Sequence, residues 1–331
     1  MTMISEKKYT FLSDGLLPLL ISVLPLTGCT SDSDGNEEQG NLVNFSLRMD
    51  GTVTRAVSTL DNIWPDNTEI AISNANNSYY YSTGSSSSVS AGVPIMLKPV
   101  SSAFHWTATD PGWQFSAWYP TSVTPADGMT VTVGIDQSTG EDAAYLAQDL
   151  LYCPPTDAPF RQTVPLTFYH QLCHVRCTIN SFNTSNVVTK VTLGQNNIAN
   201  TGKITTIGST GLDAPGTTTV WTLEDADKTK TLTMRKNEDL SNPQNYMYTY
   251  ECILPPQGGG NFNDAMFKIS TDDNKSYSYI SSFTFEAGRQ YDYSLILSKS
   301  GSVIVATVTI SNWGITNYLN VDADVPDDLQ E

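Results

Sequence analysis

The sequence predicts an all-β fold. Only 15% of its 331 residues are charged, and Thr, Ser, Asn, Val and Tyr are frequent. β-Branched and aromatic residues favour strands, and Gly and Pro are scattered along the chain, as turn residues would be. Short strand-like segments recur between turn-rich pieces at the spacing typical of a sandwich. The length suggests two such domains.

The charge balance excludes one class of function. The chain carries 17 Lys and Arg against 34 Asp and Glu, a formal net charge of −17. Nucleic-acid binding needs a basic surface that neutralises phosphates. We therefore predict no nucleic-acid partner.

The first thirty residues indicate export. Lys7 and Lys8 precede an apolar run over residues 15–26, which is shorter than the about 20 residues that span a bilayer. The run ends in Leu26-Thr27-Gly28-Cys29, which resembles the lipobox of bacterial lipoproteins. The resemblance implies that Cys29 is lipidated and becomes the mature N-terminus. The alternative is an ordinary signal peptide with an incidental Cys nearby.

Residues 30–40 contain no apolar side chain and are predicted to form a solvated tether. Asp32 and Asp34 alone do not make a calcium loop, because the other EF-hand ligands are absent. An acidic tract directly after the lipidated Cys resembles the surface-export signals of lipoproteins in Gram-negative anaerobes. It implies a surface-exposed lipoprotein of the outer membrane.

The first strand is predicted from strict alternation. Val43, Phe45, Leu47 and Met49 alternate with polar residues, a period-two pattern that indicates a half-buried strand. Residues 141–151 have a short helix-like pattern. Further strands of the first unit are predicted at residues 69–73, 79–82, 93–99, 114–118 and 129–135, with one long strand-like run at 164–180.

The polar residues 183–186 mark a predicted boundary. Residues 255–260 are predicted to be a loop, and not a phosphate cradle, because no Lys-Ser or Lys-Thr follows the glycines. Strands of the second unit are predicted at residues 187–193, 203–207, 220–223, 231–234, 246–254, 265–270, 275–285, 290–297 and 303–310.

The cluster His170, Cys173, His174 and Cys177 has helical spacing for a metal site, but its β-branched and aromatic flanks predict a strand. On a strand the two His side chains point to one face and the two Cys side chains to the other. Cys173 and Cys177 would also lie about 13 Å apart, beyond disulfide reach. We predict no metal ion and no cofactor here.

Four cysteines remain after lipidation: Cys153, Cys173, Cys177 and Cys252. They could form one bridge, for example between Cys153 and Cys173, or remain small buried thiols. No Gly-x-Ser-x-Gly elbow and no oriented Cys-His pair is evident, so the chain is predicted not to be an enzyme. The six Trp and sixteen Tyr are predicted to be mostly core, and the run Tyr79-Tyr80-Tyr81 is the best candidate for an exposed sugar-stacking surface.

Four segments, read in order, resemble the fimbrillin superfamily, whose members build type V pili. The first is Thr54-Arg55-Ala56 followed by Trp64, and the second is Phe115-Ser116-Ala117-Trp118-Tyr119-Pro120. The third is Asp149-Leu150-Leu151-Tyr152, which leads through a Pro-rich loop to Val164-Pro165-Leu166-Thr167-Phe168-x-His170. The last is Phe285-x-Ala287-Gly288-Arg289-x-Tyr291 with a closing Ile310-Ser311-Asn312-Trp313.

The resemblance implies two tandem transthyretin-like β-sandwich domains. Residues 1–28 are then the lipoprotein signal peptide and residues 29–55 an acidic tether with a removable first strand. The N-terminal sandwich covers residues 56–183 and the C-terminal sandwich residues 184–331. The resemblance also implies cleavage at Arg55 by an Arg-specific protease, followed by strand exchange with other pilus subunits.

The residues themselves support that mechanism, because a cut after Arg55 would remove both the lipid anchor and the strand at residues 43–49. The open edge would then accept a strand from a neighbouring subunit. Arg48 lies inside the strand pattern and should be protected. The stretch 315–321 is a possible donor strand, although Asn317 interrupts its alternation. A surface glycan-binding lipoprotein of a nutrient-uptake system, with a host or glycan receptor, is the alternative function.

Overall fold

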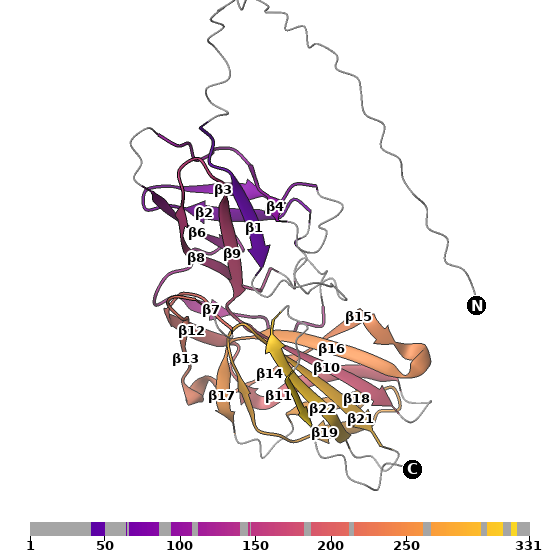
Figure 1. Ribbon diagram of the computed structural model, residues 1–331. Helices are drawn as coiled ribbons and strands as arrows, with labels where there is room; N and C mark the ends of the chain where they lie inside the picture. The colour runs from indigo at the N-terminus through magenta and orange to yellow at the C-terminus, as the bar shows by residue number, and fades with distance from the viewer. Residues whose placement is uncertain are drawn as a thin grey trace, which may run out of the picture. The chain divides into compact units, whose positions relative to one another are not determined.

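The computed structural model describes residues 41–49, 64, 66–85, 94–107, 112–139, 145, 147–181, 187–211, 215–260, 266–298, 303–313 and 319–322 (Figure 1). All of them belong to one compact unit, Glu38–Glu331. Most described residues lie in strands. The helical elements with defined bounds in this part of the chain are the 3-10 helices η1 (Asp225–Asp227) and η2 (Pro243–Asn245). The predicted all-β fold is thus confirmed, and none of the described helices could cross a membrane.

The N-terminal part of the chain forms an eight-stranded sheet that curls around a single core. Side chains from its strands meet in one cluster that includes Phe45, Ile72, Phe115 and Phe168. The order across the sheet is β4 (Ile95–Met96), β1 (Phe45–Met49), β9 (Val164–His170), β8 (Leu151–Ala158), β6 (Trp113–Tyr119), β2 (Glu69–Ser73), β3 (Ser78–Ser82) and β5 (Lys98–Pro99).

The two edge strands of this sheet are consecutive in the chain. β4 pairs with β1 and β5 pairs with β3, and only Leu97 separates β4 from β5. The predicted single strand at residues 93–99 is therefore two short strands, because the chain changes partner at Leu97. This change of partner brings the edges of the sheet together.

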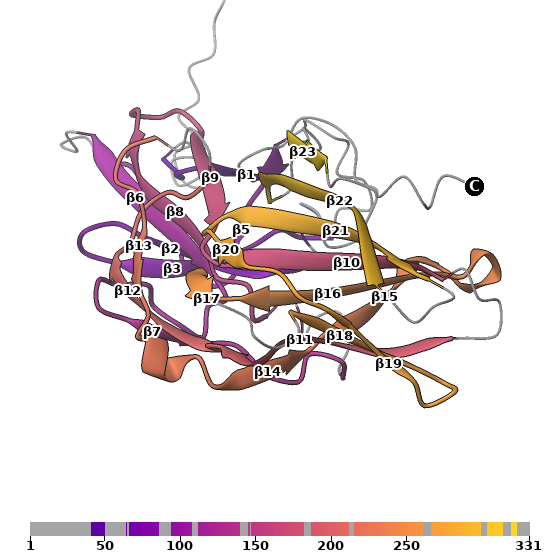
Figure 2. The same ribbon diagram turned by 90° about the horizontal axis from the view of Figure 1, so that it is seen from below.

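The C-terminal part contains two facing sheets, which form two layers in Figure 2. Val175, Cys177, Val191 and Ile269 belong to the core cluster between them. The six-stranded sheet has the order β15 (Arg235–Asn242), β16 (Met247–Leu254), β10 (Cys173–Ser181), β21 (Arg289–Leu297), β22 (Val303–Asn312) and β23 (Leu319–Asp322). The four-stranded sheet has the order β14 (Lys230–Thr233), β11 (Val188–Ile198), β18 (Phe267–Thr271) and β19 (Ser276–Tyr279).

Two smaller sheets complete the described strands. One has the order β13 (Val220–Thr222), β12 (Thr201–Thr206) and β7 (Thr130–Thr132), so a strand from the N-terminal half pairs with one from the C-terminal half. The other pairs β17 (Gln257–Gly260) with β20 (Phe283–Phe285). β17 lies within the predicted loop at 255–260, so that prediction was wrong.

Three further predictions need correction. The run 275–285 is two strands, β19 and β20, because residues 280–282 separate them. The run 164–180 is not one strand, because Gln171 and Leu172 separate β9 from β10. The segment expected to be a Pro-rich loop is part of β8, in which Pro154 and Pro155 are tolerated because the ladder with β9 ends before them, at Tyr152, and the ladder with β6 has an irregularity between Cys153 and Thr156. Proline removes a backbone donor and is compatible with a strand only where no such pairing is required.

Gln171, at the break between β9 and β10, is fully buried. Its Nε2 donates to the carbonyl oxygens of Tyr169 (3.0 Å) and Gly208 (3.2 Å), and its Oε1 accepts from Thr219 Oγ1 (2.7 Å). Buried polar groups stabilise a structure only when they are hydrogen-bonded. These bonds therefore fix the point where the chain passes from the first sheet to the six-stranded sheet.

Gly288 closes the same region from the C-terminal side. Its N–H donates to Leu172 O and its carbonyl accepts from the Trp313 N–H, both at 2.8 Å. Its φ is +69°, and a Cβ at this position would lie 2.6 Å from Thr210 Oγ1. Both the backbone conformation and the space therefore require glycine.

A residue with a Cβ in the left-handed conformation costs about 1–2 kcal/mol. We expect Gly288→Ala to lower the free energy of unfolding by more than this, because the added methyl group would also collide with Thr210. Gly112→Ala is the matched control, because Gly112 has φ +61° and a methyl group added there would meet nothing within 4 Å. Urea denaturation of both variants measures the difference. Equal losses of stability in the two variants would mean that Thr210 moves away from the added methyl group at no cost in free energy.

Candidate functional site: the first strand and its slot

β1 is an interior strand, although it is the first strand of the described chain. It pairs in parallel with β9 over all five of its residues, from Phe45 opposite Val164 to Met49 opposite Phe168. On its other side it pairs antiparallel with β4. Figure 1 shows β1 beside β9 and β4. We call the space between β4 and β9, which β1 fills, the slot.

The slot extends beyond the strand toward the N-terminus. The Val43 N–H donates to Phe104 O (2.9 Å), and the Trp106 N–H donates to Asn41 O (2.6 Å). Residues 104–106 therefore continue the wall that β4 begins. The opposite wall also continues, because the Val164 N–H donates to Asn44 O (2.9 Å).

The core-facing side chains of β1 confirm the predicted alternation. Val43, Phe45 and Leu47 are at most 2% exposed, whereas Asn44 and Arg48 are exposed; Ser46, on the predicted polar face, is buried at 5% exposure, so that face is partly covered. The Phe45 ring lies 4.9 Å from that of Phe115 and 5.1 Å from that of Tyr81, both edge to face, an arrangement favoured between aromatic rings. Full burial of each such side chain stabilises the fold by roughly 1.5–3 kcal/mol.

The two predicted processing residues, Cys29 and Arg55, lie outside the described residues. Arg48 is described: it lies within β1, opposite Thr167 of β9. A protease needs an extended segment free of ladder pairing, so the expected protection of Arg48 is consistent with this position.

The structure separates the four side chains of the predicted His and Cys cluster. Cys173 and Cys177 belong to the core cluster of the C-terminal sheets. His170 and His174 instead stack on Trp313, with ring centroids 3.9 and 4.9 Å away. The predicted division into two faces is therefore confirmed. In the described part of the chain no group of three or more His, Cys, Asp or Glu side chains is arranged to hold a metal ion.

The cysteines Cys153, Cys173, Cys177 and Cys252 are free and buried, so the bridge considered between Cys153 and Cys173 is not formed. Burial raises the pKa of the Cys153 thiol to about 11 and also raises the pKa of the other three thiols above its ordinary value. A thiol must ionise to act as a nucleophile. These four thiols are thus suited to packing and not to catalysis.

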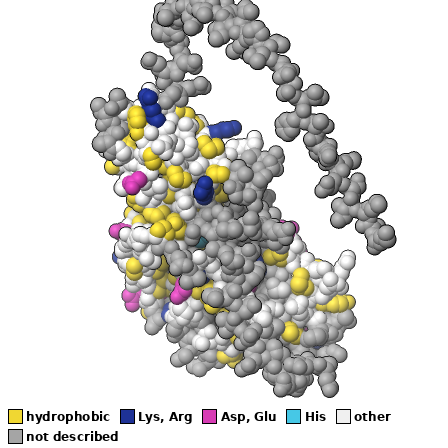
Figure 3. Space-filling view, viewed as in Figure 1, with side chains coloured by type: hydrophobic (Ala, Val, Ile, Leu, Met, Phe, Trp, Pro, Cys, Tyr) yellow, Lys and Arg dark blue, Asp and Glu magenta, His cyan; other side chains and the backbone are white. Residues whose placement is uncertain are grey.

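The predicted burial of the tryptophans is largely confirmed. Trp64, Trp106, Trp118 and Trp313 are at most 7% exposed. Of the run 79–81, Tyr81 is buried and only Tyr80 is exposed, at 48%. On the face shown in Figure 3 the exposed hydrophobic side chains lie in small separate groups.

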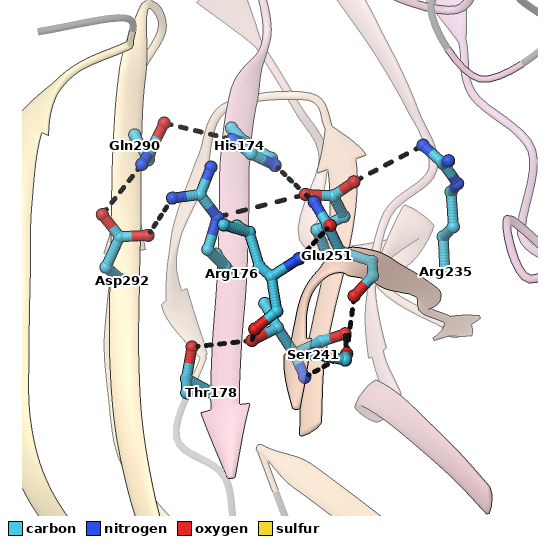
Figure 4. Close-up of polar contacts among 11 residues, drawn as sticks. His174, Arg176, Thr178, Arg235, Ser241, Glu251, Gln290 and Asp292 are labelled. Carbon is cyan, nitrogen blue, oxygen red and sulfur yellow. Dashed lines mark hydrogen bonds and ion pairs between the residues drawn. The ribbon is translucent and has the colours of Figure 1, made fainter. Parts of the chain in front are cut away.

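A row of four charged residues that sequence reasoning missed crosses the six-stranded sheet. Arg235, Glu251, Arg176 and Asp292 lie opposite one another on β15, β16, β10 and β21. Arg235 Nη1 lies 3.5 Å from Glu251 Oε1, and Arg176 Nη1 lies 3.4 Å from Asp292 Oδ1 (Figure 4). We call this row the charge ladder. Its signs alternate, so each charge faces an opposite one on the next strand.

Glu251 is the centre of the charge ladder and is fully buried. Its Oε2 also lies 3.5 Å from His174 Nε2 and accepts from Asn237 Nδ2 at 3.0 Å. Burial alone would raise the pKa of Glu251, but its contacts with His174, Asn237 and Arg176 outweigh burial and hold the pKa below its usual range. The residues are dispersed in the sequence, so no local pattern could have revealed the row.

Comparison with known proteins agrees with this architecture. A crystal structure of a candidate cell adhesion protein from Bacteroides uniformis matches with a TM-score of 0.57 and 16% identity, covering 83% of this chain and 98% of that one. A second, from Bacteroides ovatus, matches with a TM-score of 0.55 and 15% identity over 82% and 97% of the two chains. No curated protein sequence matches the chain. The profile of the fimbrillin-like family matches residues 54–313, and the chain belongs to that family.

Proposed function

We propose that the chain is a structural or adhesive subunit of a cell-surface fimbria, and that it assembles by donor-strand exchange after its N-terminus is trimmed. One observation carries the proposal. The first strand of the described chain, β1, is bound on both sides within the slot, and it and the residue Val43 before it supply three buried side chains to the core.

The position of Arg55 supports trimming as the trigger. Arg55 follows β1 in the chain, so a cut there would separate β1 and everything before it from the rest of the sheet. β4 would stay attached through Leu97 to β5, which pairs with β3, while β9 would stay paired with β8. Loss of β1 would thus leave two walls with unpaired backbone groups and an uncovered core, which a strand from another subunit could fill.

Lipidation at Cys29 would hold the untrimmed chain on the outer membrane, with residues 30–40 as the tether. The same cut would release the chain from its anchor. Trimming would therefore couple release to assembly, because the precursor keeps its own strand in the slot. The proposal assigns no catalytic residue, metal or cofactor to the chain.

The N-terminal sequence of protein recovered from the cell surface tests lipidation and trimming together. We expect a chain that begins at Ala56. Arg55→Ala should remain lipid-anchored and monomeric, whereas the matched variant Arg48→Ala, altered within β1, should be trimmed normally. Cys29→Ala should leave the precursor unanchored in a membrane fractionation.

Treatment of purified precursor with an Arg-specific protease tests assembly directly. The cut should fall at Arg55, and higher oligomers should follow, visible as filaments by negative-stain microscopy. A clean cut that yields a monomer as stable to denaturant as the precursor would contradict strand exchange. A glycan pull-down would then test the alternative, a surface glycan-binding lipoprotein, with Tyr80→Ala as the variant.

A further inference from the structure

Arg161 occupies a backbone position that normally favours another residue. It is the third residue of the turn at 159–162, which the Gln162 N–H closes by donating to Pro159 O at 3.1 Å. Its φ is +59°, a conformation that Gly or Asn adopts at lower cost than Arg. The backbone conformation therefore does not favour an arginine at this position.

The Arg161 side chain is held at the entrance of the slot. Its guanidinium carbon lies 5.1 Å from the centroid of the Phe160 ring, and that ring packs edge to face on Trp106 at 5.5 Å. A cation over an aromatic face is attracted by the ring. Arg161 is exposed to solvent, and the attraction of its guanidinium to the Phe160 ring favours this placement before any partner binds.

From this position Arg161 contacts the segment that leads into β1. Its Nη2 donates to Asn41 Oδ1 at 3.2 Å. Asn41 lies two residues before Val43, the first buried apolar residue of that segment. Among the described residues, the bond between Arg161 and Asn41 is the hydrogen bond through which a side chain of residues 41–49 contacts the rest of the chain.

We infer that Arg161 is a specificity-determining residue of the slot, which recognises an amide or carboxylate side chain two residues before the first buried apolar residue of the strand that fills it. This inference rests on the proposed function, because the strand would come from a second copy of this chain or another subunit. A carboxylate should be preferred over an amide, because it pairs with a guanidinium through charge-assisted hydrogen bonds.

The C-terminal sequence has the same order of residues as the first strand. Asn41 precedes Val43, Phe45 and Leu47 at intervals of two, and Asn317 precedes Leu319, Val321 and Ala323 in the same way. Positions 315, 317, 319 and 321 would face the core of a donor strand, and Asn317 is the polar residue among them. In the chain itself Leu319 and Val321 lie in β23, which pairs with β22. A copy of this segment released from that pairing and bound in register with the first strand would place Asn317 where Asn41 lies, beside Arg161.

The intact chain provides the first test, because it needs no exchange. We expect Asn41→Asp to raise the urea midpoint when Arg161 is present and to leave it unchanged in the Arg161→Gln background. Asn44→Asp is the matched control: Asn44 is exposed and precedes the same strand, and its substitution should have the same effect in both backgrounds. An equal shift for Asn41→Asp in both backgrounds would overturn the inference.

The second test measures selection between strands. A specific protease site is inserted between Gly51 and Thr52 of the full chain, the chain is cut, and fluorescent peptides covering residues 40–50 compete for the slot. The Asn41→Asp peptide should bind about two- to fivefold more tightly than the Asn41→Ala peptide, and Arg161→Gln should remove the difference. Lys98→Gln, which removes another cation near the slot, should preserve it.

The outcomes separate the inference from the proposed function. Entry of all peptides with equal affinity would overturn the role of Arg161 and leave strand exchange intact. If no peptide enters the cut chain, strand exchange is contradicted, and the role of Arg161 toward its own first strand is decided by the intact-chain midpoints.

Discussion

Replacing Phe45 by alanine is expected to lower the free energy of unfolding by about 3–5 kcal/mol, the usual cost of truncating a fully buried phenylalanine. Phe45 is fully buried and contacts Tyr81 and Phe115 on strands β3 and β6, as well as Phe104 at 6.1 Å. Its removal would leave a cavity bounded by rings that cannot collapse without moving several strands.

Arg48→Ala is the control for the Phe45 substitution. Arg48 lies in the same strand and in the same ladder with β9, but its side chain is exposed. Exposed substitutions of this kind usually change stability by at most about 0.5 kcal/mol. Urea denaturation of both variants measures the contrast. A loss below about 1 kcal/mol for Phe45→Ala would show that β1 contributes little to the core.

For β1, the sequence predicted the strand and its buried face but not its neighbours in the sheet. Alternation of Val43, Phe45 and Leu47 predicted both the strand and its buried face, because the side-chain period of a strand is two. Alternation does not identify the neighbouring strands. That β1 lies between β4 and β9 depends on residues far away in the sequence, so only the structure defines the slot.

Arg161 and the charge ladder could not be found from sequence for a similar reason. Arg161 is an isolated basic residue in a turn, and the role proposed for it follows only from its contacts with Phe160 and Asn41. The charge ladder depends on the register of four strands, of which β10 pairs in parallel with β21 and antiparallel with β16. Each of its charges taken alone resembles an ordinary surface charge in the middle of a strand.

The charge ladder predicts the second large effect. We expect Glu251→Gln to lower the free energy of unfolding by about 3–5 kcal/mol, because removing one partner of a buried ion pair leaves the other charges uncompensated. Arg176 and Arg235 would lose their shared carboxylate, although Arg176 would keep its contact with Asp292. Glu238→Gln is the control, since Glu238 is exposed on β15 and pairs with Lys236 at the surface.

The pH dependence of this difference provides a check on its electrostatic origin. The pKa of Glu251 is lower in the folded chain than its ordinary value, so the folded state binds a proton less readily than the unfolded state does. The stabilisation is therefore complete above the unfolded pKa of about 4.3 and is lost as the pH falls through the lower, folded pKa. The part of the stability difference between the native chain and Glu251→Gln that comes from ionised Glu251 should shrink progressively below about pH 4. Denaturation midpoints measured from neutral pH to the acid limit of folding would test this, with Glu238→Gln measured in parallel.

A stability difference that stays constant throughout this range would mean that the variant perturbs packing and hydrogen bonding, and not the charge balance of Arg235, Glu251 and Arg176.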